Sequence, residues 1–387
     1  MRRTMDTQSA FDFVDAEGDT MENQDRRAEL DAIDDEILRL FRARMDIAPQ
    51  ADSDAQTERD ALYRVCSSCD ESLQNYAKIL FSTLFDVSRT HRSALVKRAS
   101  PVVDEIRGAD RKDAFPLAAQ VACQGIEGAY SQIAAERIFS IPQIMYMNTF
   151  DGVFNAVDKG LCKYGVLPIE NSTAGSVTAV YELMKKYKFS IARSVKLRIS
   201  HTLLAKSGVA MGDIKEIYSH EQAINQCADF LQRNPRIKVT VCENTAVAAK
   251  MAAESDRTDV AALSSKNCAS IYGLNVLSSD VQNSDNNYTR FICISKGLEI
   301  YKGANKISLM LTLGNKAGAL YSLLTKFSVL GLNLTKLESR PIRGTDFEFM
   351  FYFDIDGSTE DEKVLTLMGQ LAETTDYFAF LGNYAEV

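Results

Sequence analysis

Residues 164–186 read YGVLPIENSTAGSVTAVYELMKK and show most clearly which class of structure the chain adopts. Residues 164–170 form a short apolar run that is typical of a buried strand, and the apolar positions of residues 177–186 recur with a helical period. The same order of strand and helix recurs between residues 121 and 254. Because strands that alternate with helices form parallel sheets, residues 118–298 are predicted to be an α/β domain with a parallel sheet.

Domains of two other kinds flank this α/β domain. Residues 305–384 follow the order β-α-β-β-α-β, which is the ferredoxin-like arrangement of an α+β domain. Residues 23–97 carry apolar residues at helical spacing, first at Leu30, Ile33 and Ile37, and are predicted to be all-helical. The chain is therefore predicted to be multidomain.

Two segments lack a periodic pattern. Residues 1–22 are polar and acidic, which predicts a disordered tail. Residues 98–117 mix charged residues with glycine and proline, which predicts a linker. Folded structure is therefore expected to begin at residue 23 and again at residue 118.

The composition excludes several classes of function. The chain has 387 residues, of which 46% are hydrophobic and 25% are charged, as in globular proteins with more than one domain. The formal net charge is −8 and there is no basic block, so neither nucleic acid nor an anionic membrane is an expected partner. No apolar run approaches the ~20 residues that span a bilayer, and no apolar signal core follows the N-terminus, so a cytoplasmic location is expected.

The eight cysteines and three histidines do not predict a metal site. Cys66 and Cys69 form a single CxxC pair, with no second pair and no nearby histidine to complete a zinc site. In a cytoplasmic chain of this size, cysteines are expected to be reduced core residues. The role of the Cys66 and Cys69 pair stays open.

Polar residues cluster where predicted strands meet the segments that precede or follow them. The clusters lie at residues 125–132, 168–176, 218–222 and 286–291. Ligands bind beyond the carboxyl ends of strands in α/β sheets, and backbone N–H groups with hydroxyl side chains at a helix N-terminus suit a carboxylate. Each cluster alone also fits a helix cap, a turn or the start of a strand, so a functional interpretation depends on their combination.

In this order and spacing, the motifs PIENSTAGSV (168–177), YSHEQAINQC (218–227) and NNYTRF (286–291) resemble the prephenate dehydratase family. The segments GALYSLLTKF and ESRP further along the chain resemble the ACT domain that follows the catalytic domain in this family. The segment RRAELDAIDDEILRLFRARMDIA is similar to the first helix of the chorismate mutase family. The whole chain thus resembles the fused chorismate mutase–prephenate dehydratases of phenylalanine biosynthesis.

The resemblance implies a two-lobed dehydratase domain, similar to periplasmic binding proteins, that closes on prephenate. Loss of carbon dioxide and water would give phenylpyruvate without a metal or organic cofactor. The departing hydroxyl needs a positioned proton donor, and the family assigns this role to Thr289, with Asn171 and Thr173 as further catalytic residues. The implied substrate-binding residues are Ser131, Glu170, Ser172, Gln222, Arg290 and Phe291.

The N-terminal helices depart from the chorismate mutase pattern. Arg27, Arg44 and Glu58 match charged residues of that family. Pro49 interrupts the helix that the family continues, and Ala55 stands in register with the family's essential lysine. The resemblance therefore implies absent or weak mutase activity and a structural or dimerising role for residues 23–97.

ACT domains pair with one another and bind amino acids at the shared edge. The resemblance therefore implies a homodimer or homotetramer that phenylalanine inhibits allosterically. The implied phenylalanine-binding residues are Gly318, Ala319, Leu320, Asn333, Leu334, Glu338, Ser339 and Arg340.

Three alternatives stay open at this point. The chain could be a fully bifunctional mutase and dehydratase, or an arogenate dehydratase, which acts on a substrate with an amine in place of the keto group. It could also be a non-catalytic phenylalanine sensor, although a sensor has no need of Thr289 within the TRF tripeptide. The sequence does not separate prephenate from arogenate.

Overall fold

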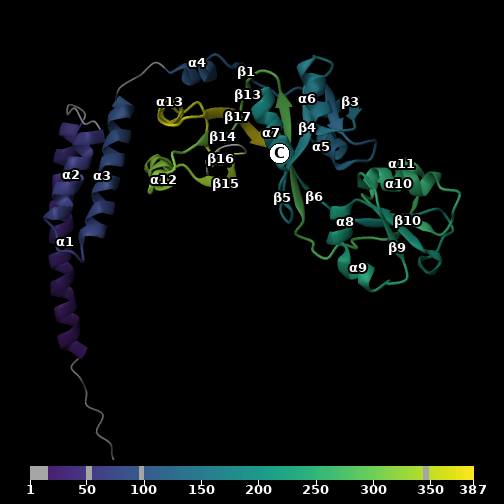
Figure 1. The fold of residues 1–387 in the computed structure, drawn as a ribbon, viewed down its shortest axis with the longest axis horizontal. Helices are drawn as coiled ribbons and strands as arrows, with labels where there is room; N and C mark the ends of the chain where they lie inside the picture. The colour runs from purple at the N-terminus through teal and green to yellow at the C-terminus, as the bar shows by residue number, and fades with distance from the viewer. Residues whose placement is uncertain (1–15, 49–54, 96–99, 343–347) are drawn as a thin grey trace, which may run out of the picture. The chain divides into compact units, whose positions relative to one another are not determined.

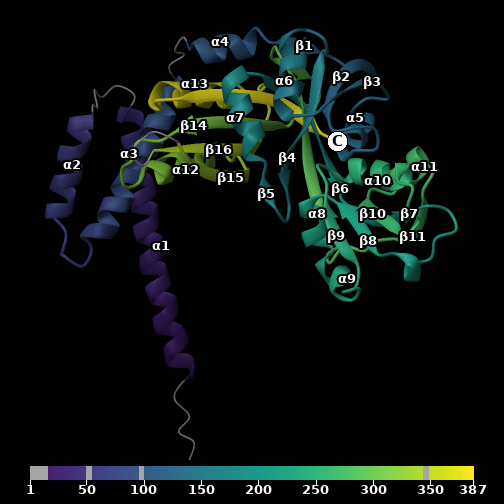
Figure 2. The same cartoon turned by 45° about the vertical axis from the view of Figure 1, so that its right-hand side comes forward.

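The computed structural model describes residues 16–48, 55–95, 100–342 and 348–387. The chain divides into two compact units, Met1–Lys97 and Arg98–Val387, which are described separately below. The first is all-helical, and the second contains the α/β and ferredoxin-like regions (Figures 1 and 2). Both assignments agree with the classes of structure that the sequence predicts.

The described residues of the first unit form three helices, α1 (Ala16–Ile47), α2 (Ala55–Ser67) and α3 (Gln74–Leu95). Helix α1 starts before the predicted boundary at residue 23, so the prediction of a disordered tail is wrong for residues 16–22. That segment, AEGDTME, combines helix-forming residues with acidic ones, and acidic residues stabilise a helix N-terminus. Residues 1–15 and the predicted break at Pro49 lie outside the described residues.

The apolar stripe of α1 is uncovered in the single chain. Leu30, Ile33 and Ile37 are 60%, 55% and 57% exposed. Among the described residues of this unit, no hydrophobic side chain is buried. Because burial of apolar surface is the main driving force for folding, the described helices of this unit lack a core of their own in the single chain.

The second unit contains two α/β lobes. Lobe 1 is built on β2 (Ala118–Gln124), β3 (Ile141–Met147), β4 (Tyr164–Asn171), β6 (Ser190–Arg198) and β12 (Tyr288–Ser295), with the short β5 (Gly175–Ser176) beside β4. Helices α6 (Phe150–Asp158) and α7 (Thr178–Tyr187) contribute buried residues to the core on one face of this sheet. Helix α5 (Tyr130–Ile138) does so on the other face.

Lobe 2 has a five-stranded sheet in the order β11-β7-β10-β8-β9. Its strands are β7 (Thr202–Ala205), β8 (Glu216–Ser219), β9 (Lys238–Val241), β10 (Val260–Ser264) and β11 (Asn275–Ser278). A 3-10 turn (Met211–Asp213) and four helices, α8 (Glu221–Gln226), α9 (Ala228–Gln232), α10 (Thr245–Glu254) and α11 (Asn267–Tyr272), complete it. The chain passes between the lobes at residues 199–201 and 279–287, and both views show lobe 2 as a separate body (Figures 1 and 2).

Both sheets are mixed, so the prediction of a parallel sheet is wrong in part. Strand β12 runs antiparallel between β4 and β6, and β7 runs antiparallel to β10. The chain returns from lobe 2 to strand β12 through residues 279–287, an irregular segment that contains no crossover helix. An antiparallel strand needs no crossover helix, whereas a parallel one does.

The C-terminal region has the predicted order β-α-β-β-α-β. It consists of β14 (Lys306–Thr312), α12 (Ala319–Val329), β15 (Leu334–Pro341), β16 (Phe349–Asp356), α13 (Glu362–Thr374) and β17 (Phe378–Glu386). The strands lie in the antiparallel order β15-β16-β14-β17, which is a ferredoxin-like sheet. The second core cluster of this unit lies here and includes Leu309, Phe327 and Phe353.

Strand β17 joins this sheet to the sheet of lobe 1. Its end turns from β14 and pairs in parallel with β6, at Ala385 and Glu386. The turn occurs at Gly382, where φ is +146° and a Cβ would lie 2.4 Å from the carbonyl oxygen of Ile191. Only glycine fits there, and the two sheets therefore form one continuous surface.

The prediction that residues 98–117 form a linker is wrong. It contains α4 (Pro101–Arg107) and β1 (Asp110–Lys112), which pairs with β13 (Glu299–Tyr301). Val103 and Ile106 are buried in the ferredoxin-like core. Proline at the first helical position and apolar residues three apart explain why this charged segment still folds onto a neighbour.

Candidate active site

A cleft of about 460 Å³ is lined by residues of both lobes. Lobe 1 contributes helix α5, the end of β4 and the start of β12, and lobe 2 contributes α8 and the start of α10. The lining residues are Gln124, Ala129, Tyr130, Ser131, Phe150, Pro168, Asn171, Val177, Ile199, His201, His220, Gln222, Ala223, Gln226, Glu243, Asn244, Thr245, Thr289 and Phe291.

Asn171 and Thr289 face each other across the β4–β12 pair. The side-chain amide of Asn171 donates a hydrogen bond of 2.9 Å to the hydroxyl oxygen of Thr289, and both residues are buried. Since the Thr289 oxygen accepts from Asn171, its own hydrogen is available to a ligand in the cleft. The pair therefore presents a hydrogen-bond donor.

A β-bulge creates this arrangement. Arg290 pairs with Glu170, but Phe291 pairs with Pro168, so Ile169 is an extra residue in β4. An extra residue reverses which face the following side chains point to. Asn171 consequently lies on the cleft face with Thr289, and Glu170 lies on the opposite face.

The orientation of the Asn171 side chain is determined by backbone donors. Its oxygen accepts from the backbone N–H groups of Thr173 and Ala174 at 3.1 and 2.9 Å, and from the Thr173 hydroxyl at 2.7 Å. Its nitrogen must then be the atom beside Thr289. Thr173 does not line the cleft, so its contribution is to hold Asn171.

The second wall of the cleft begins at the helix α8. The His220 side chain caps this helix, because its Nδ1 accepts from the backbone N–H of Gln222 at 3.3 Å. A neutral His220 therefore carries its proton on Nε2. Gln222 donates a weak bond of 3.4 Å to Asn171, and Ser131 is buried in the first turn of α5, so both lie where the sequence predicts.

The cleft contains little formal charge. Among the lining residues no lysine or arginine occurs, and Glu243 is the one carboxylate. An anionic ligand must therefore be held by neutral donors and by the helix N-termini of α5 and α10, which both open on the cleft. The described residues contain no group of side chains that could hold a metal ion.

Comparison with known proteins agrees with this geometry. The prephenate dehydratase family profile matches residues 121–298. The bifunctional chorismate mutase/prephenate dehydratase of Escherichia coli (strain K12) is 30% identical over 376 residues, which cover 92% of this chain and 95% of that protein. The chain belongs to the prephenate dehydratase family.

Two further relatives bear on substrate and ligand. Arogenate dehydratase/prephenate dehydratase 2, chloroplastic, of Arabidopsis thaliana is 36% identical over 277 residues, covering 68% of this chain and 72% of that protein. The crystal structure of prephenate dehydratase in complex with L-Phe from Arthrobacter aurescens has a TM-score of 0.62 and 28% identity. It covers 69% of this chain and 90% of that chain.

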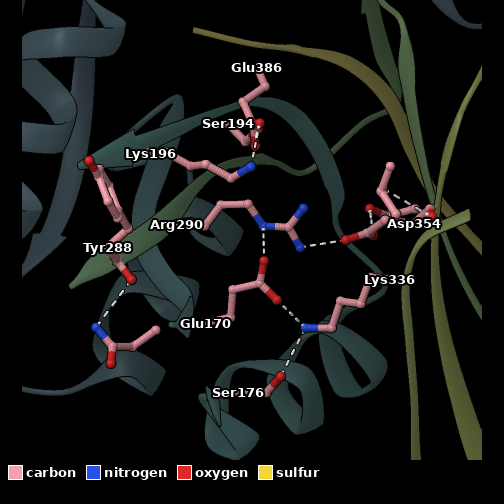
Figure 3. A network of polar contacts seen from close by, with 12 residues as sticks. Glu170, Ser176, Ser194, Lys196, Tyr288, Arg290, Lys336, Asp354 and Glu386 are labelled. Carbon is pink, nitrogen blue, oxygen red and sulfur yellow. Dashed lines mark hydrogen bonds and ion pairs between the residues drawn. The ribbon is translucent and has the colours of Figure 1, made fainter. Parts of the chain in front are cut away.

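Two residues that the family resemblance assigns to the substrate lie elsewhere. Glu170 and Arg290 do not line the cleft. Arg290 is 5% exposed and pairs with Glu170 at 2.8 Å and with Asp354 of β16 at 2.5 Å (Figure 3). Because successive side chains of a strand point to opposite faces, Arg290 cannot share the cleft with Thr289 and Phe291.

The ion-pair network, formed by Arg290, Glu170, Asp354 and Lys336, connects lobe 1 to the ferredoxin-like region. Lys336 of β15 binds the second oxygen of Glu170 at 2.5 Å and also Ser176 at 2.9 Å (Figure 3). Burial alone lowers the pKa of Arg290, but the surrounding acidic groups, including Tyr384 and Asp354, hold it above the usual value. Arg290 therefore stays a cation in spite of its burial.

The remaining predicted residues divide between the cleft and structural roles. Phe291 lines the cleft. Ser172 does not, because its hydroxyl donates to the carbonyl of Asn286 at 3.1 Å and accepts from the N–H of Tyr288 at 2.9 Å. Ser172 therefore holds the two strand ends together.

The residues predicted to bind phenylalanine lie at two places in the single chain. Gly318, Ala319 and Leu320 start helix α12, where Gly318 has φ +84°. Glu338 and Arg340 pair with each other at 2.6 Å, and both bond to residues of lobe 1. Asn333, Leu334 and Ser339 lie along the same edge strand or just before it. Their role in binding stays a prediction.

The mutase-like residues are likewise separated. Arg44 and Glu58 line a cavity of about 170 Å³ together with Arg89 and Arg92, whereas Arg27 does not line it. Glu58 forms an ion pair with Arg89, for which the sequence predicted no role.

The described helices include none with the length and apolar character that a membrane span requires.

Proposed function

We propose that this chain converts prephenate to phenylpyruvate, carbon dioxide and water. The observation that carries the proposal is the Thr289 hydroxyl, which accepts from Asn171 and so offers its hydrogen to the cleft. A hydroxyl group leaves poorly as hydroxide, and a donor aimed at it stabilises the charge that develops on the departing oxygen.

The reaction balances with one proton. The bond from the ring carbon to the hydroxyl oxygen breaks, and that oxygen takes a proton supplied by solvent through Thr289. The electron pair of the carboxylate–ring bond enters the ring, and carbon dioxide leaves. Threonine is a very weak acid, so Thr289 acts as a hydrogen-bond donor and relay.

The lack of lysine and arginine among the residues that line the cleft fits the loss of carbon dioxide from prephenate. The carboxylate that leaves carries its full charge only in the ground state, and a lysine or arginine beside it would stabilise the ground state more than the transition state. Neutral donors such as Ser131 and Gln222 can orient the molecule without that penalty. Closure of the two lobes would exclude water from the cleft.

A second candidate substrate is arogenate. Glu243 is the one carboxylate that lines the cleft, and the ammonium group of arogenate could pair with it. The Arabidopsis relative carries both activities in its name. Glu243→Gln should lower kcat/KM for arogenate and leave that for prephenate unchanged or higher if arogenate binds in this way.

The direct test is to incubate the purified chain separately with prephenate, arogenate and chorismate. Phenylpyruvate from prephenate, or phenylalanine from arogenate, would support a dehydratase. Turnover of neither compound would contradict the proposal and favour a non-catalytic sensor. Weak or absent conversion of chorismate is expected, because Ala55 stands in register with the essential lysine of the chorismate mutase family.

We propose that residues 305–384 form an ACT domain through which phenylalanine inhibits the enzyme. Support comes from the ferredoxin-like order and from the L-Phe complex of the Arthrobacter protein. The ion-pair network gives a physical link, because Arg290 is the residue next to Thr289 and binds Asp354 of this region. Phenylalanine must favour one arrangement of the network over another to have any effect.

A point variant tests this better than a truncation, because β17 also belongs to the sheet of lobe 1. Valine is strained at a positive φ, so Gly318→Val should distort the start of α12. We expect it to weaken phenylalanine inhibition while basal turnover persists. Unchanged inhibition would move the effector site away from Gly318.

We further propose that the helical unit joins two copies of the chain. Its apolar stripe is exposed, and none of its described hydrophobic side chains is buried, so a second copy would supply the missing core. Sedimentation of the full chain should show a dimer or tetramer. Ile33→Glu together with Ile37→Glu should shift it toward smaller species.

A further inference from the structure

His201 lies where the chain first passes from lobe 1 to lobe 2, and its side chain lines the cleft. The residue is 2% exposed. Its Nε2 lies 2.8 Å from the side-chain oxygen of Gln226, and its Nδ1 has no hydrogen-bond partner among the described residues. An unpartnered buried acceptor is unfavourable, so a ligand that supplies a donor there gains binding energy.

The protonation of His201 follows from a chain of side-chain hydrogen bonds. Two backbone N–H groups fix the oxygen of Asn171, so its nitrogen donates to the oxygen of Asn287 at 2.8 Å. The nitrogen of Asn287 then donates to the oxygen of Gln226 at 3.0 Å. Because that oxygen is an acceptor, His201 must donate to it from Nε2.

This assignment leaves Nδ1 of His201 as a bare acceptor. Burial lowers the pKa of His201, although its bond to Gln226 opposes the shift, so the neutral ring is favoured. The nitrogen of Gln226 donates to the Thr173 hydroxyl at 3.0 Å, which agrees with the same directions.

The two ends of this series of hydrogen bonds, Thr289 and His201, offer complementary groups. At one end Asn171 donates to Thr289, which leaves the Thr289 hydrogen as a free donor. At the other end, Nδ1 of His201 is a buried acceptor that has no partner within the described part of the chain. Both residues line the same cleft, and a hydroxyl group is a ligand that both donates one hydrogen bond and accepts another.

We propose that His201 accepts the hydrogen of the substrate's departing hydroxyl and turns the oxygen lone pair toward Thr289. This inference rests on the proposed dehydratase function. When the carbon–oxygen bond breaks, the oxygen keeps the electron pair and takes the proton relayed by Thr289. The hydrogen held by His201 leaves with the water molecule, and His201 neither gains nor loses a proton.

The backbone of His201 is held independently of its side chain. Its N–H donates to the side-chain oxygen of Gln282 at 2.9 Å, and its carbonyl accepts from the N–H of Val281 at 3.0 Å. Substitution of the side chain should therefore leave the connection between the lobes intact.

Two variants of the full chain test the roles of the two ring nitrogens of His201 separately. His201→Gln can place a donor near the position of Nε2, but it has no acceptor at the position of Nδ1. His201→Asn can place an oxygen near the position of Nδ1, but it does not reach Gln226. His91→Gln, on the exposed surface of α3, is a control for the substitution itself.

We expect His201→Gln to lower kcat/KM about 10- to 100-fold, the effect of one unpaired buried group. His201→Asn should retain more activity than His201→Gln. Phenylpyruvate lacks the ring hydroxyl, so its inhibition constant as a product should be the same in His201→Gln and the wild type. His91→Gln should match the wild type throughout.

Two results would overturn the inference. Wild-type kcat/KM in His201→Gln would show that the acceptor is not used. Parallel loss of turnover and phenylpyruvate binding would show that His201 only maintains the shape of the cleft. Absence of turnover in the wild type would instead contradict the dehydratase function itself, which the wild-type assay reveals separately.

Discussion

The two faces of strand β12 use their polar groups in different ways. On the cleft face, Thr289 and Asn171 are neutral and keep one donor available to a ligand. On the opposite face, Arg290 and Glu170 are charged and bind one another and the ferredoxin-like region. Thr289 and Arg290, which are neighbours in the motif NNYTRF, therefore belong to the cleft and to the ion-pair network respectively. The reason is that a strand alternates its side chains between its two faces.

The largest expected effect is on stability, at the ion-pair face. Arg290→Met should lower the free energy of unfolding by about 3–5 kcal/mol, because it removes the positive charge that pairs with the carboxylates of Glu170 and Asp354. Urea denaturation followed by circular dichroism measures this. Arg198→Met is the matched control, since its pair with Asp285 is 48% and 79% exposed and should contribute less than about 1 kcal/mol. Equal effects of both variants would contradict the contrast between the two faces.

The next effect is on turnover, at the cleft face. Thr289→Ala should lower kcat at least ~100-fold through loss of the donor. Stability should change little, because the Asn171 nitrogen keeps its bond to Asn287 at 2.8 Å. Thr289→Ser should retain more activity than Thr289→Ala. Steady-state kinetics with prephenate checks this, and wild-type kcat in Thr289→Ala would remove Thr289 from the mechanism.

A smaller effect is expected on regulation. Lys336→Met breaks the link between β15 and Glu170 but leaves Glu170 paired with Arg290. The coupling between phenylalanine and substrate, expected to be about 5- to 150-fold in affinity, should decrease toward none. Inhibition curves measure it, with Lys363→Met on the exposed side of α13 as the control. A full phenylalanine response in Lys336→Met would exclude this link.

The smallest effect is a pH dependence of stability. Burial alone raises the pKa of Glu338, but hydrogen bonds from Ser176 and Arg340 hold it below the usual value. Its contribution is therefore complete above the pKa of an unfolded glutamate, about 4.3, and is lost as the pH falls through the lower folded value. Urea midpoints measured between neutral and acid pH should show this loss. Glu338→Gln should flatten that part of the profile, and an unaltered profile would exclude Glu338 as its source.

Much of the fold follows from local patterns. The strands and helices of residues 118–298 and 305–384 agree with periodicity and with glycine and proline positions, which depend on neighbours in sequence. Strand direction was predicted less well, because β12 is placed by the return of the chain from lobe 2. The segment around Val103 and Ile106 was mistaken for a linker, because its charged residues conceal two side chains that only a neighbouring core can bury.

The candidate site was predicted in part. Ser131, Asn171, Gln222, Thr289 and Phe291 lie in the cleft as expected. His201 was missed because it lies outside the quoted motifs. Gln226 lies within the motif YSHEQAINQC but was not singled out, because its contacts with His201 and Asn287 form only after the lobes are placed.

The sequence by itself determined the main classes of structure and the family, since these depend on residue type and on order along the chain. Only the tertiary structure decided which side chains share the cleft. The extra residue Ile169 reverses the alternation of β4, so Asn171 faces Thr289 and Glu170 faces Arg290. A bulge depends on the register between strands that lie more than a hundred residues apart in sequence, and no local pattern in either strand specifies that register.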